Sequence, residues 1–263
     1  MVIEIKEISL CVLAGISAGI INTIAGSGSI ITLSLLSFLG LPAQIANGTN
    51  RIGLLLQSTT SSYKFYKQGE LSLRGKVWVL VFSVLGAVLG VLCASTIPVK
   101  NFEKVVGFIF CLLFLVVLFK PQKYIESSIS LKKYLPLIFG FMGFYAGFIQ
   151  AGAGVFMLAV MHAVWQKSFT ELNPLKVFII LLINCIALFG YAIVGQVDWG
   201  VGLSLGVGQI FGALIGVRLN SLKNNIEPII RFLLLGIIIV SIAKFWNLLE
   251  PISVYIIKFW NLF

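Results

Sequence analysis

The sequence has few charged residues. Only 11% of its 263 residues are Asp, Glu, Lys or Arg, whereas 59% are hydrophobic; a soluble domain carries roughly 25% charged residues. This number of charged residues is too small to cover the surface of a water-soluble globular protein. The solvent around most of the chain must therefore be a lipid bilayer. We therefore expect an all-α polytopic membrane protein.

Side chains that commonly carry out catalysis or bind metals are also scarce. The chain has 9 Asp and Glu residues, 1 His and 4 Cys, and no two cysteines form a C-x-x-C pair. This excludes a zinc site of the usual kind, and the lack of paired catalytic groups disfavours an intramembrane enzyme. No Walker motif is present, so ATP does not drive this chain directly. We expect no enzyme activity, no cofactor and no metal.

The positive charge is placed as in a membrane protein. The net charge is +10, and the basic residues lie at the ends of apolar segments, which is typical of cytoplasmic loops. The pattern indicates membrane topology and no nucleic-acid partner. Residues 121–133 are polar and basic, and we interpret them as a cytoplasmic linker.

A short glycine-rich stretch occurs twice. Ala25-Gly26-Ser27-Gly28 is matched by Ala151-Gly152-Ala153-Gly154, and 152 − 26 gives an offset of 126 residues. Further landmarks recur at the same offset without a gap: Asn47 and Asn173, Gly69 and Gly195, Gly86 and Gly212, and Gly90 and Gly216. Because glycines are used where backbone must bend or approach closely, this register predicts one structural unit used twice.

The apolar segments support two such units. We predict segments over 8–25, 29–41, 45–66, 77–97 and 102–120, and then over 134–150, 154–166, 173–195, 200–219 and 227–246. The second segment of each half is shorter than the roughly 20 residues of a spanning helix, so each glycine-broken pair either forms a re-entrant hairpin or crosses at a tilt, and about three spanning helices follow it. The resulting domains are a first repeat (1–120), the linker (121–133), a second repeat (134–246) and an interfacial tail (247–263). The basic clusters orient the two halves oppositely, which predicts inverted-topology repeats, a feature of secondary transporters.

The glycine breaks are the candidate substrate site. A helix broken inside a membrane exposes backbone N–H groups and the positive end of its dipole, which together attract anions. Buried cations add to this attraction and indicate function. The candidate substrate-binding residues are Asn22, Gly26, Ser27, Gly28, Ser29, Thr49, Asn50, Arg51, Gln150, Gly152, Ala153, Gly154, Asn173 and Lys176. The alternatives are that the glycines only allow close packing and that Arg51 and Lys176 only extend to the interface.

Other polar residues in apolar segments need an explanation. His162 and Glu171 are candidates for a coupling proton, although a structural role suits His162 as well. The amides of Gln57, Asn184 and Gln209 need partners, which are either other helices or the substrate.

Several motifs together resemble the sulfite exporter TauE/SafE family, also called the TSUP permeases. The first-half motifs are Ile21 to Thr32, Leu39-Gly40-Leu41-Pro42 and Gly48-Thr49-Asn50. The second-half motifs are Gly143 to Gly147, Gly152-Ala153-Gly154, Gly195 to Trp199 and Gly208 to Leu219. The chain departs from the family pattern at Ser27, Ser29 and Leu175. The resemblance implies a bacterial inner-membrane permease for small sulfur-containing or organic anions, acting by secondary transport, and a homodimer.

The expected function combines both lines of reasoning. We predict a secondary transporter (permease or exporter) of small anions such as sulfite or a sulfonate, with alternating access at a site between the two glycine breaks. The alternative is a channel or exchanger for a different small solute or ion.

Overall fold

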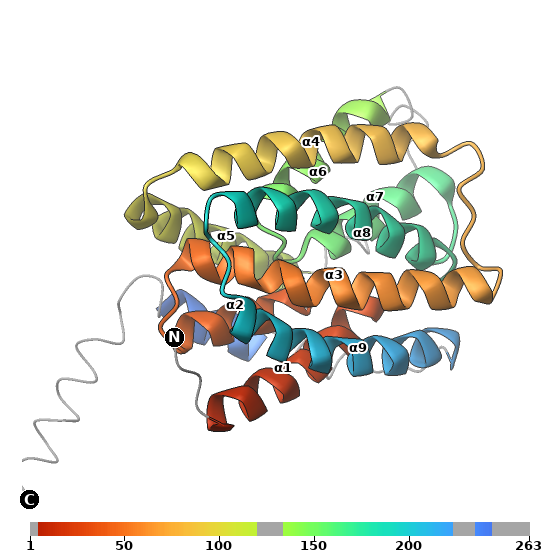
Figure 1. The fold of residues 1–263 in the computed structure, drawn as a ribbon. Coiled ribbons are helices and arrows are strands. Elements are labelled where there is room, and N and C mark those ends of the chain that lie inside the picture. The colour runs from red at the N-terminus through yellow and green to blue at the C-terminus, as the bar shows by residue number, and fades with distance from the viewer. Residues whose placement is uncertain (1–4, 120–133, 223–234, 244–263) are drawn as a thin grey trace, which may run out of the picture.

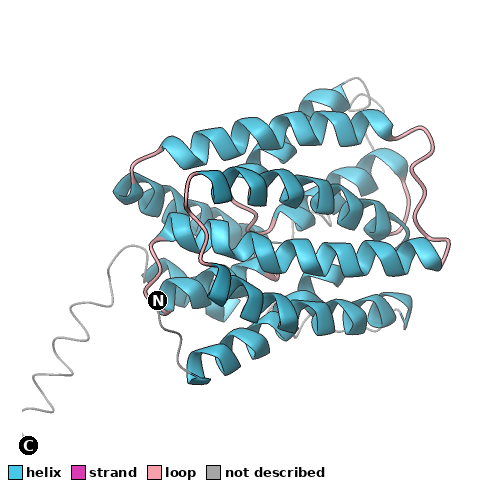
Figure 2. Ribbon diagram, viewed as in Figure 1, coloured by secondary structure: helices cyan, strands magenta, loops and turns pink. Residues whose placement is uncertain are grey.

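The structure, a computed structural model, describes residues 5–119, 134–222 and 235–243. Within these residues the predicted all-α fold is confirmed: helices are joined by turns, and no strand is present (Figure 1 and Figure 2). Residues 235–243 add a helical stretch, whereas the predicted linker 121–133 and tail 247–263 lie outside the described residues. The labelled helices are α1 Ile5–Ile24, α2 Ser29–Phe38, α3 Ala43–Lys67, α4 Val77–Thr96, α5 Val99–Phe119, α6 Leu135–Phe148, α7 Ala153–Trp165, α8 Phe169–Ile193 and α9 Trp199–Leu222.

The helices suit a bilayer. Four helices of the described chain, α1, α4, α8 and α9, are long and apolar enough to cross a membrane. On α4, the exposed Leu85, Leu89 and Leu92 follow helical spacing and form an outward apolar stripe. Many polar side chains are instead buried between the helices. Apolar outside and polar inside is the arrangement of a multi-pass membrane protein.

The second helix of each half is short, as predicted. Helix α2 has 10 residues and α7 has 13, whereas about 20 are needed to span. In Figure 1, α2 returns toward the side on which α1 begins, and α7 returns toward the side on which α6 begins. The path of the chain therefore favours the hairpin alternative over a tilted crossing for both glycine-broken pairs.

Helices from the two halves pack against each other extensively. Helix α1 lies along α9 and α4 lies along α6, while α3 contacts both α8 and α9. Small residues bring these backbones together: a Cβ atom on Gly19 would lie 2.6 Å from the carbonyl oxygen of Gln209, and one on Gly90 would overlap the carbonyl oxygen of Phe144. Close backbone approach of this kind is how helices associate in lipid.

The backbone of the two halves bends at corresponding positions. Gly26 and Gly152 both have a positive φ, of 83° and 70°, and Gly69 and Gly195 have 72° and 71°. A third pair lies at the same offset of 126, because Gly40 (φ 86°) is matched by the non-glycine Gln166 (φ 53°). Glycine spacing alone did not predict this third turn, since its second copy has a side chain. Helices α3 and α8 also run in opposite directions in Figure 1.

Candidate functional site

The two glycine breaks meet. A Cβ atom added to Gly26 would lie 2.5 Å from the Cα atom of Gly154, and one added to Gly154 would lie 2.6 Å from the Cα atom of Gly26. Neither position can accept a side chain without displacing backbone. The tips of the α1–α2 and α6–α7 hairpins are thus in direct contact, as expected for breaks that form one site.

Hydrogen bonds connect the two tips. The Ser29 hydroxyl donates to the carbonyl oxygen of Gln150 at 3.1 Å, and the Ser29 backbone N–H donates to Asn22 Oδ1 at 3.1 Å. Other backbone N–H groups at the breaks are used locally: Ile30 donates to the carbonyl of Ser27, and Ala153 donates to the carbonyl of Gln150. These N–H groups, which were expected to face an anion, are therefore engaged within the protein.

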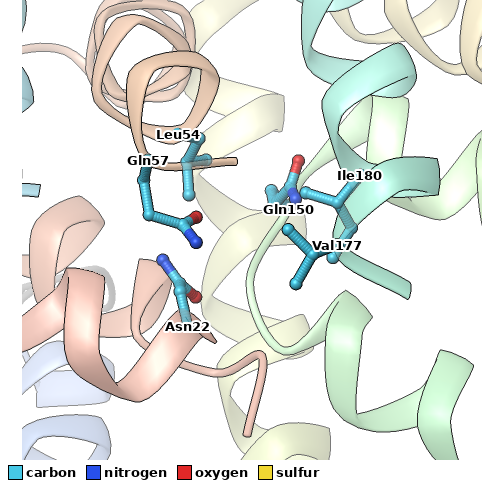
Figure 3. Close-up of a pocket in the computed structure, with 6 residues that line it drawn as sticks. All are labelled: Asn22, Leu54, Gln57, Gln150, Val177 and Ile180. Carbon is cyan, nitrogen blue, oxygen red and sulfur yellow. The ribbon is translucent and has the colours of Figure 1, made fainter. Parts of the chain in front are cut away.

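A small cavity lies beside the tips. It has room for about one water molecule, and Figure 3 shows residues from α1, α3, α8 and the α6–α7 connection around it. The amide groups of Asn22 and Gln57 point toward one another, and Gln150 lies across from them. The lining residues are Asn22, Leu54, Gln57, Gln150, Val177 and Ile180.

Arg51 is fully buried next to this cavity. Its Nη1 atom donates to the carbonyl oxygen of Ala146 at 2.7 Å and to Gln150 Oε1 at 2.8 Å, and its Nη2 atom donates to the carbonyl oxygen of Gly147 at 3.1 Å. The guanidinium group also donates to Asn47 Oδ1 at 3.2 Å. Since Ala146 and Gly147 belong to the last turn of α6, Arg51 caps the end of a helix from the other half of the chain.

Lys176, one residue before the position that matches Arg51 at the offset of 126, caps a helix end in the same way. Its Nζ atom donates to the carbonyl oxygens of Asn22 at 3.0 Å and Thr23 at 3.4 Å, in the last turn of α1. Asn173 Nδ2 supports it by donating to the carbonyl oxygen of Thr23 at 2.6 Å, as Asn47 Nδ2 does to that of Phe148 at 2.9 Å. Each half thus supplies one buried cation and one asparagine to the helix end of the other half.

The positive charge of these two side chains is not neutralised. All described partners of Arg51 and Lys176 are neutral, and the described residues contain no carboxylate within ion-pair distance of either. Each break holds both a helix C-terminus and a helix N-terminus, whose partial charges of roughly −0.5 and +0.5 offset each other. With both groups protonated, the site therefore carries close to two uncompensated positive charges.

Unused hydrogen-bond donors lie in the same place. Asn22 Nδ2, Asn184 Nδ2 and Arg51 Nε are buried without a partner among the described residues. The orientation of both amides is fixed, because Asn22 Oδ1 accepts from Ser29 N–H and Asn184 Oδ1 accepts from Arg51 Nη1 at 3.4 Å. The unpaired atom of each amide is thus a donor, which suits an acceptor-rich ligand.

The comparisons with known proteins agree with this arrangement. A model of the sulfite exporter TauE/SafE family matches residues 11–245. The chain belongs to the TauE/SafE family. Its curated homologues are named as probable membrane transporters, which agrees with the transporter predicted from the sequence.

Curated relatives of this TauE/SafE protein match over most of their length. A probable membrane transporter protein of Haemophilus influenzae is 28% identical over 87% of this chain and 91% of its own. The probable membrane transporter protein ORF9 of Sinorhizobium is 29% identical over 88% and 87%, and YfcA of Escherichia coli is 24% identical over 86% and 85%. No solved structure matches the chain significantly.

Some predicted site residues of the TauE/SafE protein lie at the tips. Asn22 and Gln150 line the cavity, Gly26, Ser29 and Gly154 make the tip contacts, and Gly28, Gly152 and Ala153 begin the short helices. Ser27 is buried in the same turn.

Thr49 is placed differently, because its hydroxyl oxygen accepts from Asp198 N–H at 2.8 Å and connects α3 to the start of α9. Asn50 is buried, and its Oδ1 atom has no partner among the described residues.

The two candidates for proton coupling lie at the α7–α8 turn. His162 Nδ1 is 2.8 Å from the carbonyl oxygen of Lys167. Glu171 forms a capping box with Ser168 at the start of α8 and an exposed ion pair with Lys167. These described bonds do not reach the residues that line the cavity. The proton-coupling role of both residues stays a prediction.

Tyr191 is a site residue that the sequence did not reveal. Its hydroxyl lies 2.9 and 3.0 Å from the carbonyl oxygens of Gly147 and Phe148, which share its single hydrogen, and its ring centroid lies 5.5 Å from the guanidinium carbon of Arg51. A tyrosine within an apolar span needs a partner for its hydroxyl, and this was the available signal. Gln57 and Asn184, which were expected to need partners, do lie beside the cavity and Arg51.

Proposed function

We propose that this membrane transporter moves small anions, of which sulfite, a sulfonate or another sulfur-containing organic anion fits best. The observation that carries the proposal is the pair of buried cations, Arg51 and Lys176, whose described partners are all neutral. Positive charge without a counter-charge is costly at low dielectric, and an anion in the cavity would offset it. The unpaired donors of Asn22, Asn184 and Arg51 match the oxygen atoms of a sulfite or sulfonate group.

The transport mode in this proposal is alternating access between the two breaks. The cavity has room for about one water molecule, and a sulfite ion, with four heavy atoms, needs more. The hairpin tips must therefore separate before the anion binds. A closed site formed by two opposed hairpins favours a rocking transporter over an open channel, and the opposite directions of α3 and α8 are consistent with inverted repeats.

Ligand-induced stabilisation of the purified protein tests the proposal. A ligand that binds the folded state raises its melting temperature by mass action. Sulfite, thiosulfate, sulfoacetate, taurine, succinate and sulfate form the panel, and we expect a shift with at least one sulfur-containing anion. Uptake of the same anion by proteoliposomes then distinguishes transport from binding.

Variants locate the site. We expect Arg51→Lys, which keeps the charge but loses the planar fork, to weaken anion binding at least about tenfold. Lys104→Ala removes an exposed cation from α5 and serves as the control, which should bind as the wild type does. Unchanged binding in both Arg51→Lys and Lys176→Ala would contradict a site between the breaks.

The homodimer implied by the family resemblance is part of this proposal. Light scattering of the detergent-solubilised protein, corrected for bound detergent, gives the protein mass. A mass of one chain would remove the dimer from the proposal and leave the anion site unchanged.

A further inference from the structure

The two buried cations differ in their ability to lose a proton. A guanidinium group stays protonated at every pH that a protein experiences, whereas a lysine ammonium group can become neutral. Among the described residues around the cavity, Lys176 is therefore the cation whose charge can change during a transport cycle. Its Nζ atom lies 3.0 Å from the carbonyl oxygen of Asn22, which lines the cavity.

Lys176 lies on α8 next to residues that line the cavity. Val177 and Ile180, the next residue and the residue one turn further, line the cavity, and Asn184 follows one turn beyond. Lys176 thus lies at the edge of the helix face that an anion would contact. The same face holds the unpaired Nδ2 atom of Asn184.

The surroundings of Lys176 make its charge depend on a ligand. The side chain is fully buried, and its described partners are two backbone carbonyl oxygens. An ammonium group without a counter-charge is disfavoured in such a place, whereas an anion in the cavity supplies that counter-charge. By linkage, an anion that favours the protonated lysine is itself bound more tightly when the lysine is protonated.

We propose that Lys176 carries the coupling proton of a proton–anion symport. Lys176 takes a proton from the solution on the side where the anion enters, and holds it as an ammonium group while the anion is bound. It returns the proton to the solution on the side where the anion leaves. This inference rests on the proposed function of the same site and adds the coupling ion.

No other charged or titratable group in the described chain is bonded to Lys176. The titratable groups on its own helix and on the helices around it are Lys6, Glu7 and Cys11 on α1, Arg51, Tyr63, Lys64, Tyr66 and Lys67 on α3, Lys76 and Cys93 at the two ends of α4, Tyr145 on α6, His162 on α7, Glu171, Cys185 and Tyr191 on α8, and Arg218 on α9. The described partners of Lys176 Nζ do not include any of them. His162 and Glu171 are held at the α7–α8 turn by their own contacts.

Proton uptake on anion binding tests the proposal. The purified protein is mixed with sulfate, thiosulfate or methanesulfonate in weak buffer with a pH indicator. These probes are fully ionised near neutral pH, so any proton taken up is bound by the protein. We expect about one proton per bound anion at a pH where Lys176 is neutral in the empty site.

Variants assign the proton to its carrier. Lys176→Arg keeps a permanent charge, so it should bind the anion with less than about a fifth of the wild-type proton uptake. Lys176→Met, the neutral variant, should bind the anion at least about tenfold more weakly, and with no dependence on pH. Lys104→Arg, an exposed lysine on α5, is the matched control, and it should take up protons as the wild type does. Loss of proton uptake in His162→Gln or Glu171→Gln would place the proton at the α7–α8 turn and overturn the assignment to Lys176.

Proteoliposomes provide the second measurement. An inward proton gradient without a membrane potential should drive accumulation of the anion by the wild type. Lys176→Arg should retain anion exchange but lose this accumulation. Anion binding by the wild type without proton uptake, or equal uptake by Lys176→Arg, overturns the coupling and leaves anion transport standing. If none of the three probes binds, the proposed function fails for these anions, and the coupling fails with it.

Discussion

The two halves hold their buried cations in different ways. Arg51 donates to five residues, from its own helix, α6, the second break and α8, and Tyr191 covers it. Within the described part of the chain, Lys176 donates only to two neighbouring carbonyl oxygens at the end of α1. Arg51 is thus fixed by a network of hydrogen bonds, whereas Lys176 has few described partners. The difference indicates that Arg51 serves as a structural anchor, while Lys176 has the freedom to change its charge.

Removing each cation in turn should show the difference between Arg51 and Lys176 most clearly. Arg51→Met leaves several buried oxygen atoms without donors, at about 1–3 kcal/mol each, so we expect a loss of at least about 4 kcal/mol or no folded protein. Lys176→Met should cost about half as much, because Thr23 keeps its bond from Asn173. Thermal unfolding in detergent measures both variants. Equal losses of stability in the two variants would contradict the distinction between Arg51 as a structural anchor and Lys176 as a cation with few partners.

The tip contact should have the next largest effect. Gly26→Ala forces a side chain against the backbone of Gly154, and Gly26 also has a positive φ of 83°. Gly40→Ala is the matched control, since φ is 86° there and nothing lies within 4 Å of the added Cβ atom. We expect about 1–2 kcal/mol for the control, from backbone strain alone. Gly26→Ala should lose about 3 kcal/mol or more, and transport with it. Similar values for both would show that the tips are not packed as described.

The serine of the first break should matter moderately. Ser29→Ala removes the hydroxyl that donates to the Gln150 carbonyl across the tips, and the equivalent position in the second half is Val155. We expect a loss of about 1 kcal/mol and slower anion uptake. Ser204→Ala is the control, because the described hydrogen bond of this hydroxyl is to the Gly200 carbonyl within α9. Uptake reduced equally in both variants would remove Ser29 from the site.

The smallest effect concerns the turn that has glycine in one half and glutamine in the other. Gln166 has a φ of 53°, which costs energy for a residue with a side chain. Gln166→Gly should therefore raise stability by up to about 1 kcal/mol, reduced by the loss of its 2.8 Å hydrogen bond to the Ala163 carbonyl. Gly40→Ala, at the corresponding turn, should change stability in the opposite direction. Two changes of the same sign would contradict the equivalence of these turns.

The sequence predicted the helices and breaks better than the contacts of the site. The segment predicted at 77–97 is the helix Val77–Thr96, because apolar runs and flanking basic residues are local signals. The partners of Arg51 were not predictable, because Ala146 and Gly147 come near it only after α6 packs into the other half. Thr49 was assigned to the site by its motif, yet its hydroxyl accepts from the start of α9.

Capping of each half by the other has a consequence for biosynthesis. When the first half leaves the ribosome, the carbonyl groups of Asn22 and Thr23 have no donor until Asn173 and Lys176 have been made, about 150 residues later. Likewise, Arg51 enters the membrane before the helix end that it will cap. The first half must therefore wait in the translocon or the bilayer as an incomplete unit. Insertion of this transporter is finished only when the second half inserts against the first and closes both helix ends.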